Sequence, residues 1–81
     1  MHESPYKVGK KYKCSEVVCF EPERTWVIEI LEERVGEEGG EKFWEYLCKT
    51  IEFEGVPEDW EPEWEDEGHL DGAEAQEIIE K

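Results

Sequence analysis

Two tryptophans lie inside the most acidic stretch of the sequence, and this combination suits the binding of a cation. Trp60 and Trp64 are four residues apart. Indole rings are enriched at interaction hot spots and attract lysine or arginine through cation–π contacts, while neighbouring carboxylates form ion pairs. We therefore take both rings as a candidate partner-binding site, together with the acidic residues that flank them: Glu58, Asp59, Glu61, Glu63, Glu65, Asp66 and Glu67.

The same two tryptophans also have a structural interpretation. Both rings can fold back over a sheet and cover a small core, because a large apolar ring is costly to leave in water. The acidic side chains would then simply face the solvent. The two interpretations are compatible if one ring covers the core and the other docks on a partner.

Cysteine and histidine side chains raise the question of a metal site. The chain has three cysteines, Cys14, Cys19 and Cys48, and two histidines, His2 and His69. Structural zinc usually takes four such ligands, some of them in closely spaced pairs. Cys14 and Cys19 lie in a stretch that we expect to be extended, where their spacing would point them to opposite faces. We expect small buried thiols and predict no metal and no dedicated calcium loop.

The sequence does not favour catalysis. A nucleophile pair of Cys48 and His69 can be drawn, but nothing near either residue supports it. Carboxylate pairs are uninformative among 24 acidic residues, because a catalytic pair needs one acid with a pKa raised in a pocket. The sequence has no glycine-rich phosphate-binding loop. We therefore predict a protein that is not an enzyme and has no cofactor.

A basic cluster near the N-terminus follows the pattern of nucleic-acid-binding proteins, in which lysine meets phosphate and an aromatic ring meets a base. The net charge of −15 opposes this interpretation, since so few lysines cannot attract a polyanion unless the acids lie far away. We expect them to balance acids of the fold or to protect a strand edge. The cluster consists of Lys7, Lys10, Lys11 and Lys13, with Tyr6 and Tyr12 between them.

The negative charge is distributed unevenly along the 81 residues. Met1–Phe53 contains 12 acidic and eight basic residues, whereas Glu54–Lys81 contains 12 acidic residues and one basic residue. Such a segment repels nucleic acid and anionic lipid, so we predict no direct contact with either. A basic protein surface is the expected partner, and its capture should be fast and sensitive to salt. The alternative is that the acidity serves only solubility or adaptation to salt or heat.

The density of carboxylates after Glu54 suits imitation of a short DNA duplex, which carries about one charge per 1.7 Å of its axis. In size and acidity the chain resembles the DNA-mimic proteins that phages make against restriction and CRISPR systems. The resemblance implies an inhibitor that occupies the nucleic-acid-binding groove of a basic protein. The alternative is an SH3-like interaction module or assembly subunit with an aromatic patch formed by Trp26, Trp44 and Tyr46.

Elements that can position these residues are expected to be mainly strands. Lys10–Phe20 alternates and then becomes apolar, which predicts a strand. Thr25–Val35 and Glu41–Phe53 are rich in β-branched and aromatic residues, and the glycines of residues 36–40 between them predict a long β-hairpin. An αα-hairpin is the alternative, because the same two segments also have apolar stripes at helical spacing.

The predicted architecture is a single domain over residues 1–81, built on a small bent antiparallel sheet or SH3-like half-barrel of about three strands. Residues 1–9 are an irregular lead-in, residues 10–53 the sheet, residues 54–70 an acidic loop, and residues 71–81 a C-terminal helix. Pro57 and Pro62 argue against regular structure in the loop, and Asp71 with Glu74 predicts the start of the helix. The predicted core consists of Trp26, Ile28, Ile30, Leu47, Ile51 and Phe53.

The expected location is the cytoplasm. No apolar run approaches the roughly 20 residues of a membrane span, and no apolar segment follows the first lysines as in a signal peptide. An odd number of cysteines fits a reducing compartment. Ile78 and Ile79 on the predicted helix need cover from the sheet or a partner, which makes a homodimer a reasonable expectation.

Overall fold

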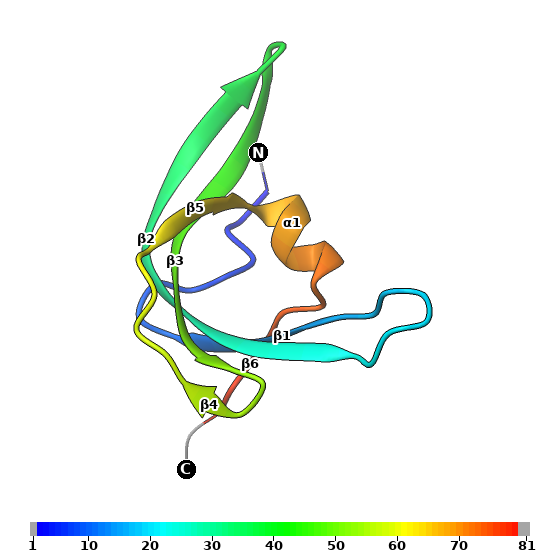
Figure 1. Cartoon of the computed structure of the whole chain (residues 1–81). Coiled ribbons are helices and arrows are strands. Elements are labelled where there is room, and N and C mark those ends of the chain that lie inside the picture. The colour runs from blue at the N-terminus through cyan, green and yellow to red at the C-terminus, as the bar shows by residue number, and fades with distance from the viewer. Residues whose placement is uncertain (1, 80–81) are drawn as a thin grey trace.

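The computed structural model describes residues 2–79 and shows a mainly β molecule built on one curled antiparallel sheet (Figure 1). The strand order is β4-β3-β2-β1-β6, and β5 pairs with β3. The predicted bent antiparallel half-barrel is confirmed, but within the described residues the sheet has six strands rather than about three. The elements are β1 (Lys11–Glu16), β2 (Arg24–Glu38), β3 (Glu41–Phe53), β4 (Val56–Pro57), β5 (Glu63–Asp66), α1 (Glu67–Gly72) and β6 (Gln76–Glu77).

The β2–β3 hairpin forms the main part of the sheet, as predicted, and rules out the αα-hairpin. Its strands are rich in β-branched and aromatic residues, which pack well on a pleated surface. Gly39 and Gly40 turn the chain with φ of 59° and 82°, a conformation that glycine adopts without steric cost. The far end of the hairpin projects beyond the rest of the molecule (Figure 1).

Two bulges bend this hairpin. Ile51 is an extra residue on β3, and Leu31 is an extra residue on β2, because the pairing of the two strands shifts at both points. An extra residue in one strand kinks it and increases its twist. The sheet therefore curls, and the outer edge of β3 pairs with β4 at one end and with β5 near its middle.

The concave side of the sheet holds the core. Side chains from β1, β2 and β3 meet the N-terminal segment and α1 there. The ring of Tyr6 lies edge-on to those of Tyr12 and Tyr46, with centroid distances of 5.2 Å and 5.4 Å. The buried cluster consists of Tyr6, Tyr12, Cys14, Ile28, Ile30, Tyr46, Cys48, Leu70 and Ala73.

Each of the three buried tyrosines has a hydrogen-bond partner for its hydroxyl. Tyr6 donates to Asp71, and Tyr46 shares a hydrogen bond of 2.7 Å with the hydroxyl of Ser4. The Tyr12 hydroxyl accepts from a backbone amide of the N-terminal segment at 2.9 Å. A core this rich in tyrosine is stable only because these buried polar groups are satisfied. Residues 2–10 form no helix or strand, yet these bonds make this segment part of the core.

The buried face of β3 is the opposite of the predicted one. Tyr46 and Cys48 are buried, whereas Leu47, Ile51 and Phe53 are only partly buried. Both faces of this strand carry apolar residues, so alternation could not decide between them. The bulge at Ile51 also interrupts the alternation, and the tyrosines of the N-terminal segment and β1 cover the face that carries Tyr46.

The core residues predicted for β2 are confirmed, whereas the predicted aromatic patch of Trp26, Trp44 and Tyr46 is wrong. Ile28 and Ile30 are buried, and Trp26 packs against the core cluster. Trp44 also packs against that cluster, and Tyr46 has none of its surface exposed. A residue this deep in the core cannot touch a partner, so the three aromatic residues do not form an exposed patch.

The acidic stretch of residues 54–70 is not one loop, contrary to the prediction. It contributes β4, β5 and the start of α1. Pro57 lies in the two-residue strand β4 at the edge of the sheet, where a missing backbone N–H is tolerated. Pro62 directly precedes β5 and so does not interrupt its pairing with β3. The prolines therefore divide the stretch without preventing regular structure.

The predicted helix over residues 71–81 is wrong within the described residues. The helix α1 starts earlier, behind Asp66, whose Oδ1 accepts a hydrogen bond of 2.7 Å from the backbone N–H of His69. Asp66 and not Asp71 is thus the N-cap. Residues 80 and 81 lie outside the described residues.

The same helix also ends earlier than predicted, in a left-handed turn. Glu74 has φ of 52°. Its N–H donates to the carbonyl of Asp71, and the N–H of Ala75 donates to the carbonyl of Leu70. This is the hydrogen-bond pattern of a Schellman motif, which normally has glycine at the left-handed position. The carbonyl of Ala73 then accepts from the sheet at Ser15 N, 2.8 Å away.

The predicted strand Lys10–Phe20 ends at Glu16, and its apolar second half forms an exposed loop between β1 and β2 (Figure 1). Val17 is 77% exposed and Phe20 is fully exposed. Phe20 also adopts a left-handed φ of 66°, which interrupts an extended conformation. Pro22 cannot donate to a strand ladder, so the pairing with β2 does not continue through the loop.

The C-terminal segment lies along β1 as β6. The N–H of Ile78 donates to the carbonyl of Lys11 at 2.9 Å. Ile78 is partly buried, whereas Ile79 is 80% exposed. Within residues 2–79, no helix has the length and apolar character that crossing a membrane requires.

Candidate functional site

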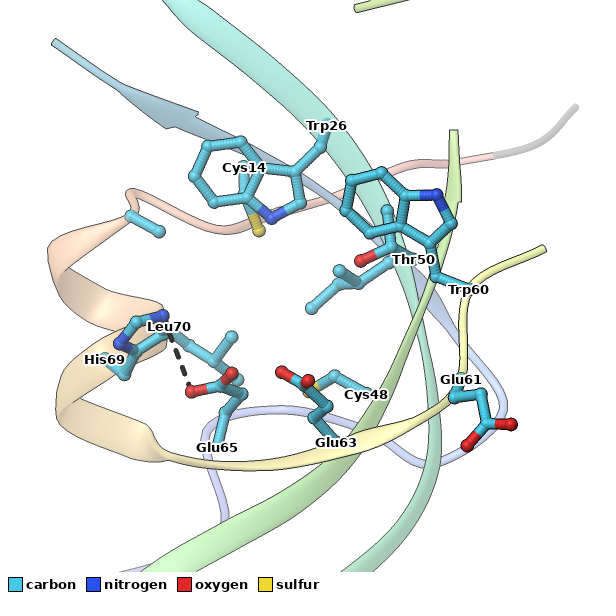
Figure 2. Close-up of a pocket in the computed structure, with 12 residues that line it drawn as sticks. Cys14, Trp26, Cys48, Thr50, Trp60, Glu61, Glu63, Glu65, His69 and Leu70 are labelled. Atoms are coloured by element: carbon cyan, nitrogen blue, oxygen red, sulfur yellow. Dashed lines mark ion pairs between the residues drawn. The ribbon is translucent and has the colours of Figure 1, made fainter. Parts of the chain in front are cut away.

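A cavity of about 390 Å³ opens between the curled sheet and α1 (Figure 2). Figure 2 shows the indoles of Trp26 and Trp60 on one side of it. The carboxylates of Glu63 and Glu65 and the imidazole of His69 lie on the other side. The remaining lining is mostly apolar or small: Cys14, Ile28, Cys48, Thr50, Leu70 and Ala73, with Glu61 at the edge.

The pairing of β5 with β3 places the acidic side chains. Trp64 is opposite Leu47, between two glutamates that are opposite Cys48 and Tyr46. Successive side chains of a strand point to opposite faces, so Glu63 and Glu65 turn toward the cavity and Trp64 turns away from it. The two glutamates of β5 that flank Trp64 are therefore collected on one side, at the cavity.

Trp60 is held at the cavity by a ring contact and two hydrogen bonds. Its ring stacks on Phe53, with centroids 5.3 Å apart and planes inclined by 29°. Its Nε1 donates to Glu58 at 3.0 Å, and its backbone N–H donates to the carbonyl of Thr50. The residue is nonetheless 46% exposed. It thus forms an aromatic wall of the cavity that is supported by Phe53 and leaves part of its surface exposed.

Trp64 lies on the opposite face and already has a cationic partner. The guanidinium carbon of Arg34 is 3.8 Å from the centroid of its ring. The Nε of Arg34 donates to Glu45 at 3.0 Å. Trp64 therefore belongs to an internal contact between β5 and the hairpin and does not line the cavity.

The other predicted acidic residues are distributed over several structural tasks. Asp59 pairs with Lys49 at 2.6 Å, a contact that lowers the pKa of Asp59 through a hydrogen bond and the lysine charge. Glu67 accepts from His2 at 2.6 Å and from the backbone N–H of Trp44 at 3.2 Å. Asp66 caps the helix, and Glu58 holds the indole of Trp60. The predicted set is thus divided, and only Trp60, Glu61, Glu63 and Glu65 meet at the cavity.

His69 is the basic group at the cavity. Its Nε2 is 3.5 Å from a carboxylate oxygen of Glu65, four residues earlier in β5. The imidazole is 60% exposed. This long contact is therefore weak and leaves the Glu65 carboxylate able to bind another cation. No lysine or arginine lines the cavity among residues 2–79.

Two buried thiols form part of the cavity floor. Burial raises the pKa of Cys14 to about 11. Burial, followed by the negative charges of Glu65 and the neighbouring thiol, raises the pKa of Cys48 to about 12. Cys48 and His69 do line the same cavity, but a thiol held in its protonated form is a poor nucleophile. Among the described residues, no group of three histidine, cysteine or acidic side chains is arranged to hold a metal ion.

Trp26 and Thr50 were not predicted as cavity residues, because they lie on β2 and β3, outside the acidic stretch. The alternation of Glu61, Glu63 and Glu65 was a usable signal for an extended segment with one acidic face. Comparison with known proteins adds no family: no family model, no curated protein and no solved structure matches this chain.

Proposed function

We propose that the protein is a small acidic, non-enzymatic binding protein that engages a basic protein surface. One observation carries the proposal: the carboxylates of Glu63 and Glu65 lie at a cavity with indole walls, which Glu61 also lines (Figure 2). Glu61 and Glu63 make no ion pair within residues 2–79. They are both exposed and so are available to cations of a partner.

The charge of the whole chain supports the same partner. A net charge of −15 on 81 residues sets up a field that attracts cationic surfaces from a distance and repels nucleic acid and anionic lipid. Such steering raises association rates and weakens as salt is added. The field of the acidic protein attracts the basic surface of the partner, and contacts at the cavity then orient that surface.

Surfaces with dense lysine and arginine are commonly those that bind nucleic acid. We therefore propose that the partner is a nucleic-acid-binding protein and that the acidic protein occupies its groove as a DNA mimic. An inhibitor of a host defence nuclease, of the type that phages encode, is the most specific form of this proposal. A reducing, cytoplasmic location suits its three free thiols.

Competition with DNA tests this function. A fluorescent duplex is bound to a basic nucleoid protein, and the acidic protein is titrated in at about 0.1 M salt, where the Debye length is about 10 Å. We expect release of the duplex and a fall in anisotropy. If the duplex stays bound to every basic protein in a panel, while direct binding to the same proteins is also absent, the proposal is wrong.

An interaction module that uses apolar contacts is the second candidate. The aromatic patch around Tyr46 does not exist at the surface, but the loop between β1 and β2 exposes Val17 and Phe20. Binding through that loop would survive about 1 M salt, where the Debye length is about 3 Å, and would be lost in a Phe20→Ser variant. If neutralising the acids changes only aggregation, their role is solubility.

A further inference from the structure

We propose that the cavity binds the guanidinium group of an arginine side chain that the partner supplies. This inference rests on the proposed function, because a basic protein surface has to provide the arginine. The negative charge of the chain attracts any cation, whereas the cavity would select one chemical group.

The shape of the cavity suits one side chain. Its volume of about 390 Å³ is at the small end of the range for ligand sites. Ile28 and Leu70 make part of the lining apolar, which suits the methylene groups of a long side chain. The polar groups are concentrated on the side that carries Glu63 and Glu65 (Figure 2). An inserted chain would thus keep its stem on apolar surface and its charged head near carboxylates.

An internal arginine site shows how this fold holds a guanidinium. Arg34 lies over the ring of Trp64 at 3.8 Å and donates to a glutamate of β3 at 3.0 Å. That site lies on one face of β5. The cavity lies on the other face and offers the same kinds of group, an indole and glutamates, with no arginine or lysine among its described lining residues. The cavity therefore has the composition of an arginine site in which the arginine is not part of this chain.

The charge at the cavity favours a cation. Glu63 has no ion pair within the described part of the chain, and the contact of Glu65 with His69 is 3.5 Å long. Burial is the first cause of the raised pKa of Cys48 and the charge of Glu65 the second, so the negative field of this glutamate reaches the cavity floor. Low-dielectric walls concentrate this field at the opening. A cation entering the cavity is attracted, and an anion is repelled.

Geometry separates arginine from lysine. A guanidinium is flat, stacks on an indole, and presents a fork of N–H groups that matches carboxylates. An ammonium is a compact, strongly hydrated charge that gains less from a flat ring. With Trp60 on one side and Glu63 and Glu65 on the other (Figure 2), a guanidinium can stack and pair at once. The cavity should therefore prefer arginine to lysine at equal charge.

Two peptides test this preference. In one, arginine alternates with glycine, and in the other, lysine replaces every arginine, so that length and charge are the same. Dissociation constants are measured by titration calorimetry at about 0.1 M salt. We expect the arginine peptide to bind about tenfold more tightly, which corresponds to about 1.4 kcal/mol.

A matched pair of variants locates the preference. Glu63→Gln/Glu65→Gln removes two charges at the cavity, and Glu37→Gln/Glu38→Gln removes two charges from exposed residues at the far end of the β2–β3 hairpin. The cavity variant is expected to lose the preference for arginine, while the hairpin variant retains it. Both variants keep the backbone of the wild type, which circular dichroism verifies.

The indole N–H signals in an NMR spectrum provide a readout that needs no variant. We expect the arginine peptide to shift the signals of Trp26 and Trp60, which line the cavity. The signal of Trp44 should stay in place, since Trp44 does not line the cavity. Shifts confined to other tryptophans would overturn the assignment of the site.

The outcomes separate this inference from the function on which it rests. Equal binding of the two peptides, or equal losses in the two variants, would leave a general affinity for cations and would overturn only the arginine site. Absence of binding to either peptide and to basic proteins would overturn both. Preference for arginine that disappears only in the cavity variant supports both.

Discussion

The guanidinium of Arg34 lies over the ring of Trp64, with 3.8 Å between its carbon and the ring centroid. This contact joins β2, in the long hairpin, to β5, in the acidic stretch. It fixes the face of β5 that carries Trp64 and thereby turns the glutamates on either side of it toward the cavity. One internal cation–π contact thus helps to orient the groups that we propose for an external cation.

Removal of the Arg34 guanidinium should weaken the packing of β5 against the β2–β3 hairpin. We expect Arg34→Met to lower the free energy of unfolding by about 1 kcal/mol, because a cation–π contact and a partly exposed ion pair are both lost. Arg24→Met is the matched control, since Arg24 is half-exposed and within residues 2–79 pairs with Glu21 alone, also half-exposed, at 3.2 Å. Chemical denaturation measures both variants. Equal losses would contradict a special role of the ring contact.

Alkaline pH should destabilise the protein through its buried thiols and tyrosine hydroxyls. Burial raises the pKa of Cys14 to about 11 and that of Cys48 to about 12, and it also raises the pKa of Tyr6 and Tyr46. Each folded pKa exceeds the unfolded one. The contribution to stability is therefore complete below the unfolded pKa, near 9.0 for a thiol, and is lost as pH rises toward the folded pKa.

The expected loss at one pH unit above the unfolded value is about 1.4 kcal/mol for each buried thiol. Denaturation at about pH 7 and about pH 10 measures it. The decrease in the free energy of unfolding between these two pH values should become smaller in Cys14→Ala/Cys48→Ala and should stay the same in Cys19→Ala. A flat dependence of stability on pH in this range would show that the thiols are not buried in solution.

Thiol labelling should separate the three cysteines. Cys19 is exposed in the loop between β1 and β2, while Cys14 and Cys48 are buried. We expect iodoacetamide to modify Cys19 rapidly at neutral pH and to modify the other two only after denaturant is added. Mass spectrometry counts the labels. Rapid modification of all three cysteines in native buffer would contradict the packing of the cavity floor.

A glycine at position 74 should stabilise the end of α1. Glu74 has φ of 52° in a Schellman motif, where glycine avoids the steric cost of the left-handed conformation. We expect Glu74→Gly to raise the melting temperature and the free energy of unfolding by about 1 kcal/mol. Glu77→Gly, in β6, is the control and should lower both values, because glycine weakens an extended segment. A loss in Glu74→Gly would contradict this helix end.

The strands were predictable because their residues and turn agree with each other. Thr25–Val35 and Glu41–Phe53 combine β-branched and aromatic residues, and Gly39 and Gly40 supply the positive φ of the turn between them. The buried face of β3 was not predictable, because Leu47 on one face competes with Tyr46 on the other. Tyr46 is buried since tertiary contacts satisfy its hydroxyl, and no local pattern contains that information.

The helix and the cavity were harder to predict for different reasons. Asp66 and Asp71 are both plausible N-caps by local sequence, and the left-handed Glu74 that ends the helix is an unusual residue for that position. The cavity combines residues from β1, β2, β3, β5 and α1, so only the three-dimensional arrangement brings Trp26 near Trp60. The acidic side of the cavity was predictable in part, because Glu61, Glu63 and Glu65 occupy alternate positions in the sequence.

The most direct test of the central claim compares binding to a basic nucleic-acid-binding protein before and after the cavity carboxylates are neutralised. Glu61→Gln/Glu63→Gln/Glu65→Gln is matched with Glu37→Gln/Glu38→Gln/Glu41→Gln, whose residues are exposed at the end of the hairpin. Dissociation constants are measured at about 0.1 M and about 1 M salt. We predict that the cavity variant binds at least about tenfold more weakly than the hairpin variant at low salt, and that high salt removes wild-type binding. Wild-type binding that is equally strong at both salt concentrations and unchanged in the cavity variant would contradict the account.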